Sequence, residues 1–189
     1  MEQIYLRDEQ LERATADMLK KGEYEGCSFL NCDLSNADLS EYIFDGCTFD
    51  GCNLSLVKLQ KTTFREVDFR NCKMWGLRLD ECNPFGLAFS FQNCALNHSS
   101  FYQLKMKKQV FKECKLTECY YTQCDLTGAI FHNCDLSGAM FENSILEQAD
   151  FRTAMNYSID PDGNKIKKAK FSLPAVTGLL HKYDIKIEA

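Results

Sequence analysis

The chain has eleven cysteines, which could bind a metal or form disulfides, and three histidines, which could bind a metal. No two cysteines have the CxxC spacing that is typical of zinc sites and thioredoxin-like redox sites. None of the histidines, His98, His132 and His181, has a second histidine at a metal-binding spacing. His132 lies close to Cys134, but the repeat described below directs these two side chains to opposite sides. The spacing therefore favours reduced cysteines that are buried as small packing residues.

Catalytic motifs are not found either. The sequence contains no GxSxG, no phosphate-cradling glycine loop and no HExxH. An aspartate does recur at one position of the repeat, at Asp33, Asp38, Asp68, Asp125, Asp135 and Asp150. Such a row could resemble an array of catalytic carboxylates, but aspartates of this kind are usually solvated or hydrogen-bonded to their own turns. We therefore expect no catalytic residue, no metal, no cofactor and no enzymatic activity.

The cysteines follow a period of five residues, with one offset of two between Cys82 and Cys94. Apolar residues recur on the same period, two positions after each cysteine, and neither a helix nor an ordinary strand produces this spacing. A longer period of 20 residues overlies it, with a single step of 22 in the middle. Three rows share these steps: Phe29, Phe49, Phe69, Phe91, Phe111, Phe131 and Phe151; Leu34, Leu54, Met74, Leu96, Leu116 and Leu136; Cys32, Cys52, Cys72, Cys94, Cys114 and Cys134.

Four pentapeptides therefore form one coil, and successive coils stack at about 4.8 Å through backbone ladders. Two side chains of each pentapeptide point inward and three point outward, so each inward column places like residues on like. The turns often hold residues that tolerate a positive φ, such as Asn31 and Gly51. We expect about seven coils between Tyr24 and Phe171, with a two-residue insertion somewhere in residues 82–91.

Residues 36–40 (NADLS), 125–129 (DLTGA) and 135–139 (DLSGA) carry the clearest copies of the repeat. This pattern resembles the pentapeptide-repeat family, whose consensus is a small residue, Asp or Asn, Leu or Phe, a polar residue and then often Gly. The resemblance implies an all-β fold, a right-handed quadrilateral parallel β-helix, over residues 22–171. Within the family, the chain looks similar to the quinolone-resistance (Qnr-like) members.

Both ends of a β-stack must be covered or paired. At the N-terminus, residues 1–21 are expected to form a cap of strand or helix, with Asp8 beginning a helix that carries Leu11, Ala14, Met18 and Leu19. The interruption at residues 83–88 has two interpretations, a structural irregularity or an outward loop that contacts a partner.

Residues 172–189 are expected to form a helix and a short strand. Ser172 and Pro174 suit a helix start. The segment either covers the last coil or joins two rods in a homodimer. The resemblance favours the homodimer, because the C-terminal helix has this role in the gyrase-protecting members. The apolar residues that would form the dimer contact are Leu173, Val176, Leu179, Leu180, Tyr183, Ile185 and Ile187.

Charge alternates along the chain, although the net charge is only -5. Residues 1–55 and 116–160 are acidic, residues 56–115 are basic, and the remainder is weakly basic. The sequence shows no secretory signal and no apolar run long enough to span a membrane, so we expect a cytoplasmic protein. The candidate acidic face for partner binding comprises Asp33, Asp38, Glu41, Asp45, Asp50, Asp125, Asp135, Glu142, Glu147 and Asp150.

Two functions of different classes remain open. The resemblance implies a rod that mimics DNA and binds a type II topoisomerase, DNA gyrase or topoisomerase IV, so that it protects against quinolones. A surface of carboxylates can compete for the Lys and Arg groups that bind phosphates, but the basic middle of the chain departs from this pattern. The alternative is a protein-interaction scaffold with an unrelated partner, in which the charge bands provide electrostatic complementarity. Direct nucleic-acid binding through the basic middle is a weaker third interpretation.

Overall fold

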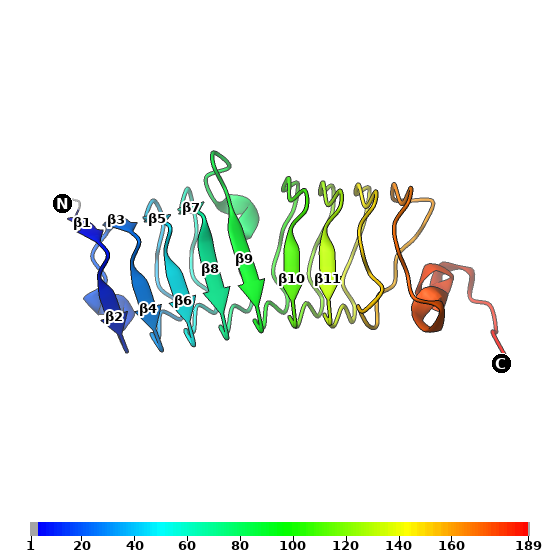
Figure 1. Cartoon of the computed structure of the whole chain (residues 1–189), viewed down its shortest axis with the longest axis horizontal. Coiled ribbons are helices and arrows are strands. Elements are labelled where there is room, and N and C mark those ends of the chain that lie inside the picture. Colours follow the sequence, from blue (N-terminus) through cyan, green and yellow to red (C-terminus); the bar gives the residue numbers. More distant parts are fainter. Residues whose placement is uncertain (1–3, 189) are drawn as a thin grey trace.

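The computed structural model describes residues 4–188, which form an elongated rod of stacked coils with the chain ends at opposite ends of the rod (Figure 1). The fold is a right-handed quadrilateral parallel β-helix, so the predicted fold class is confirmed. Residues 1–3 of the expected N-terminal cap, and residue 189, lie outside the described range. Within that range, no helix is both long and apolar enough to cross a bilayer.

Four faces surround the rod, and each is a parallel ladder of residues from successive coils. Face 1 is the four-stranded sheet β1-β3-β5-β7, and face 2 is the seven-stranded sheet β11-β10-β9-β8-β6-β4-β2. Faces 3 and 4 are ladders of single bridges, such as Asp33 to Asn53 and Tyr120 to Met140. The strands are β1 (Ile4–Arg7), β2 (Gln10–Glu12), β3 (Gly22–Glu25), β4 (Ser28–Leu30), β5 (Ile43–Asp45), β6 (Thr48–Asp50), β7 (Thr63–Arg65), β8 (Val67–Arg70), β9 (Phe89–Gln92), β10 (Val110–Lys112) and β11 (Ile130–His132).

The register has the period that the sequence indicates. Phe29 pairs with Phe49, and Phe69 pairs with Phe91 across the step of 22. The backbone N–H of Asn83 still donates to Thr62 in the ordinary register, whereas the N–H of Val67 donates to Ala88 in the shifted one. The insertion therefore lies in residues 84–87, just after the short 3-10 helix η2 (Leu79–Glu81). The chain rises there as a loop above the neighbouring corners (Figure 1).

Aromatic rings fill the interior of face 2. The ring centroids of Phe91 and Phe111 lie 5.6 Å apart, and those of Phe111 and Phe131 lie 5.1 Å apart, with nearly parallel planes. Phe101 and Tyr121 from face 4, on the opposite side of the coil, meet Phe111 edge-on. Stacked and edge-on pairs of this kind add stabilisation beyond the burial of their apolar area.

The cysteines occupy a position where a small hydrogen-bond donor fits. The thiol of Cys72 donates to the carbonyl of Phe49 in the preceding coil, and the thiol of Cys52 makes the same contact with Phe29. Thr62 and Asn164 occupy the equivalent position in other coils and donate in the same way, to Leu39 and Phe141. Thiol, hydroxyl and amide are therefore interchangeable at this position, because each can bond the same carbonyl within a tight space.

Each corner of a coil turns at a residue in the left-handed region. The φ of Asn31 is 53° and that of Gly51, one coil further on, is 65°. A Cβ on Gly51 would lie 2.4 Å from the side-chain oxygen of Asn31, so any other residue at this corner would require that side chain to move. Asparagine amides also join the corners, since Asn93 donates to Asn71 at 2.8 Å.

The predicted N-terminal helix is wrong for the described residues. Asp8 is a corner residue with φ 53°, and β2 and the 3-10 turn η1 (Ala16–Met18) occupy the rest of the segment. Leu11 pairs with Phe29 and so extends the aromatic column by one level. Coil stacking prevails over helix formation because it buries Leu11 and Ala14 against a preformed surface.

The C-terminal segment also differs from the prediction. It forms two 3-10 helices, η3 (Leu173–Leu179) and η4 (His181–Tyr183), and residues 184–188 form no strand. The carbonyl of Gly178 accepts a hydrogen bond from the N–H of Ile159, which holds η3 against the last coil. A Cβ on Gly178 would lie 2.3 Å from the carbonyl oxygen of Tyr157, so the close approach requires glycine.

Replacement of Phe111 by alanine tests the aromatic column. The change removes a fully buried ring between two stacked neighbours, so we expect the free energy of unfolding to fall by about 3–5 kcal/mol. Urea unfolding followed by circular dichroism measures this. Val110→Ala, at the adjacent outward position, is the control and should cost about 0.5 kcal/mol. Equal losses in the two variants would show that the column is not the stabilising core.

Candidate functional site

The thiols lie inside the rod. All eleven cysteines are free and buried. Burial raises the pKa of Cys47 and of Cys82 to about 12, so both remain thiols at neutral pH. His132 is exposed while Cys134 is buried. Within residues 4–188, no group of three His, Cys, Asp or Glu side chains is placed to hold a metal ion.

The ten acidic residues singled out from the sequence do not form one face. Asp33, Asp38, Asp45 and Asp50 lie on faces 3, 4, 1 and 2 of a single coil. The second group is dispersed in the same way, with Asp125 on face 1, Asp135 on face 3, Glu142 on face 4, Glu147 on face 1 and Asp150 on face 2. A run of charge about as long as one coil wraps around the axis, so these residues form two acidic rings.

Basic residues on the adjacent coils pair with many of these carboxylates. Asp45 lies 3.4 Å from Arg65, and Asp125 lies 3.4 Å from Lys107. Glu41 pairs with Lys21, and Asp150 pairs with Arg152 at 2.7 Å on its own coil. Residues at one column position in successive coils are neighbours, so charge bands that alternate along the chain become ion pairs along the rod.

Several aspartates also bond their own turns. The hydroxyl and the N–H of Ser35 both donate to Asp33, at 2.7 and 3.1 Å. These hydrogen bonds lower the pKa of Asp33, the hydroxyl bond being the larger cause. Thr127 makes the same pair of bonds to Asp125. The row of aspartates is therefore part of the repeat's turn structure.

Apolar side chains are exposed at outward positions that the sequence analysis did not single out. Tyr120 and Met140 are bridged neighbours on face 4, with Tyr102 on the coil before them. Val110 and Ile130 are paired neighbours on face 2. Each of these side chains except Tyr102 stands one residue before an inward residue, where the repeat usually has a polar group. An outward position occupied by an apolar residue is the signal that could have identified them. The five are about two-fifths exposed.

The inserted loop carries the most exposed aromatic ring. Phe85 is 78% exposed. Below it, the side-chain oxygen of Asn83 accepts a hydrogen bond from the N–H of Phe85, and its amide donates to the hydroxyl of Thr63. The backbone of the loop that carries the ring is therefore hydrogen-bonded, through Asn83, to the preceding coil.

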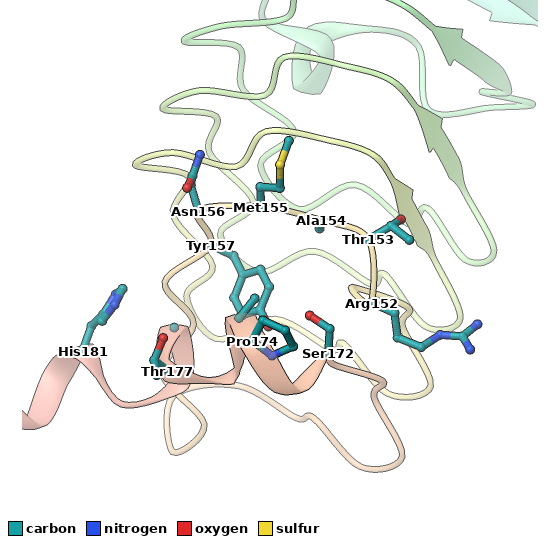
Figure 2. A pocket seen from close by; sticks show the side chains of 12 residues that line it. Arg152, Thr153, Ala154, Met155, Asn156, Tyr157, Ser172, Pro174, Thr177 and His181 are labelled. Carbon is teal, nitrogen blue, oxygen red and sulfur yellow. The ribbon is translucent and has the colours of Figure 1, made fainter. Parts of the chain in front are cut away.

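A groove of about 490 Å³ lies between the last coil and η3. Its floor includes Tyr157, whose ring is directed from the coil towards the helix that carries Pro174 and Thr177 (Figure 2). Tyr157 is buried, and η3 therefore covers the end of the aromatic column. This arrangement is that of a lid.

The seven residues expected at a dimer contact divide into two groups. Leu179 packs against the core, and Val176 and Leu180 are half-buried, so these three belong to the lid. The other four, Leu173, Tyr183, Ile185 and Ile187, are exposed. The lid and an apolar outer surface are therefore present together in one segment.

Stacked pentapeptide coils with two side chains of each repeat inside define the class of pentapeptide-repeat β-helices. The chain belongs to the pentapeptide-repeat family, because the model of the pentapeptide repeat region matches residues 23–90 and 78–151, more than half of the chain. No curated protein matches the sequence at a significant level.

Solved structures of similar fold include QnrB1, a plasmid-mediated fluoroquinolone resistance protein. Full-length QnrB1 is 18% identical, with 96% of this chain and 100% of QnrB1 covered and a TM-score of 0.47. A trypsin-treated QnrB1 variant is 21% identical, with 98% of both chains covered and a TM-score of 0.48. HetL, a pentapeptide-repeat protein involved in heterocyst differentiation regulation in the cyanobacterium Nostoc, is 17% identical, with 90% and 85% covered and a TM-score of 0.31.

Proposed function

We propose that this chain is a non-catalytic rod that binds another protein through its outer surface. The observation that carries the proposal is the set of apolar side chains held outward on a rigid backbone, above all Tyr120 and Met140 on face 4 and Phe85 on the loop. Exposed aromatic and methionine side chains are enriched in the energetic centres of protein interfaces. Since the ladders already hold the backbone, little conformational entropy is lost on binding.

Replacement of these side chains tests the proposal. The full-length chain, used as bait in its native cells, should recover at least one protein specifically, as measured by quantitative mass spectrometry. The triple variant Phe85→Ser, Tyr120→Ser, Met140→Ser should recover about tenfold less of it, because the apolar contacts are lost.

A matched triple variant at outward polar positions, the half-buried Ser40→Ala and the exposed Gln60→Ala and Gln92→Ala, should recover as much as the unaltered chain. Recovery of no specific protein, or equal recovery by both triple variants, would contradict the proposal.

A second candidate function is DNA mimicry in the cytoplasm towards a type II topoisomerase, DNA gyrase or topoisomerase IV, with protection against quinolones. The two acidic rings support it, because they surround the rod with carboxylates at two levels. Carboxylates can compete with DNA phosphates for the same Lys and Arg groups. The ion pairs between coils and the basic middle of the rod reduce the charge available for this competition.

Gyrase supercoiling, measured with and without ciprofloxacin, tests the second candidate. At micromolar concentration, the protein should change supercoiling or relieve the inhibition of gyrase by the drug. The double variant Asp45→Asn, Asp50→Asn should weaken this effect several-fold, because it removes two charges of one ring. Asp17→Asn, outside both rings, is the control. An unchanged reaction at micromolar protein would eliminate mimicry and leave the protein-binding proposal intact.

We further propose that two rods form a homodimer through the C-terminal segment, because Leu173, Ile185 and Ile187 expose apolar surface beyond the lid. Light scattering should give twice the chain mass for the full-length protein and one chain mass after truncation at Phe171. Ile185→Lys with Ile187→Lys should also give a monomer, and it leaves the lid in place. A dimer mass for this double variant would refute the contact.

A further inference from the structure

The loop and a cluster of lysines lie together on the outside of the rod. Arg78 is bridged to Ser100, and the side-chain amide of Gln109 donates to the carbonyl of Phe89 at 3.0 Å. The segment between Ser100 and Gln109 therefore covers the segment that contains the loop. Three exposed lysines on that segment, Lys105, Lys107 and Lys108, lie on face 1 and its corner, one coil after the loop.

Arg65, followed by the exposed Glu66, lies on the coil below the loop. Its side chain lies beside Gly86, 3.6 Å from where a Cβ of that residue would be. The loop that carries Phe85 therefore lies on the coil between that of Arg65 and that of the three lysines. Glycine at this corner has φ 70°, which lets the loop turn back close to Arg65.

Part of this positive charge is not neutralised within the rod. Lys107 pairs with Asp125 and Arg65 pairs with Asp45. Lys105 and Lys108 make no ion pair among residues 4–188. Their ammonium groups are thus available to a ligand, at positions held by the coil.

The positive surface is short along the axis, and this property selects the kind of ligand. The ring that contains Asp45 lies below it, and Asp125 and Glu147 follow above it on face 1. The cations between them span only about two coil spacings, or about 10 Å. Duplex DNA carries a charge about every 1.7 Å and would meet carboxylates on both sides. A compact acidic patch fits the available length.

We propose that Phe85, Lys105 and Lys108 form a docking surface for an acidic segment of a partner protein that offers an apolar pocket to the phenyl ring. This inference rests on the proposed protein-binding function and names its site and the charge of the partner. Phe85 acts as the buried anchor, and the lysines steer the acidic segment towards it. Because Asn83 bonds both the backbone N–H of Phe85 and the hydroxyl of Thr63, the backbone that carries the ring is held in place before binding.

The test is the binding of a fluorescein-labelled amphipathic peptide that alternates glutamate with leucine, measured by fluorescence anisotropy on the full chain. Lys105→Glu with Lys108→Glu should weaken binding about tenfold, and Phe85→Ala about fivefold. High salt should reduce the loss of affinity caused by the charge variant, because salt screens ion pairs. The loss caused by the ring variant should remain. Circular dichroism melting verifies that each variant is folded.

Matched controls exist in the same chain. Lys165 and Lys168 occupy the equivalent positions of face 1 near the C-terminal end, where no loop adjoins them, and Lys165→Glu with Lys168→Glu should change affinity less than twofold. Leu56 is an exposed apolar corner residue elsewhere, and Leu56→Ala should have no effect. Equal losses in the controls, or no binding of the peptide, would overturn the inference.

Two further probes distinguish other ligand classes. These probes are short duplex DNA and phosphatidylserine vesicles. The assignment to a protein would be overturned if either bound more tightly than the peptide, bound more weakly to the Lys105→Glu, Lys108→Glu variant, and bound equally well to the Phe85→Ala variant. In the native-cell experiment, a partner that both loop-surface variants retain would refute this site and leave the proposed function standing. Recovery of no partner by any form of the chain would refute the proposed function itself.

Discussion

Backbone ladders between coils are the constraint on which the rest of this structure depends. The coils repeat after 20 residues, or after 22 at the insertion, so each residue of the ladders lies over its counterpart in the coil before it. The inward positions must then accept the same kind of side chain many times in succession. Phenylalanine satisfies this by stacking, and cysteine satisfies it by bonding the carbonyl of the preceding coil. A residue type that could not stack on itself would interrupt the core at every level.

The same constraint governs what the outside of the rod can do. Neighbours along the axis come from residues 20 apart, and neighbours around the axis come from adjacent pentapeptides. A charge band in the sequence therefore becomes a ring, and opposite bands on adjacent coils become ion pairs such as Asp45 with Arg65. The eleven cysteines, which could bind a metal or form disulfides, are all buried inside the rod. What remains outside is a rigid surface of mixed charge with isolated apolar side chains, which suits recognition.

The two-residue insertion changes the outer surface of the rod but leaves the core continuous. Faces 2, 3 and 4 resume their register on the far side, so the core continues without a break. The additional residues have no position in the ladders and must leave the rod, and they carry an aromatic ring with them. The insertion thus places the most exposed ring of the middle of the rod on the coil that precedes the three lysines, without loss of stacking elsewhere.

The sequence by itself determined the period, the inward columns, the corner residues and the approximate place of the insertion, because each of these repeats and the repetition can be read directly. It could not determine the ends, because Leu11 and Gly178 lie outside the clear repeat and only the folded chain pairs Leu11 with Phe29 and brings Gly178 against Tyr157. It also gave no means to locate the acidic residues around the axis until the four faces were known. The placement of Phe85 one coil before Lys105 and Lys108 likewise follows from stacking, because these residues belong to different coils.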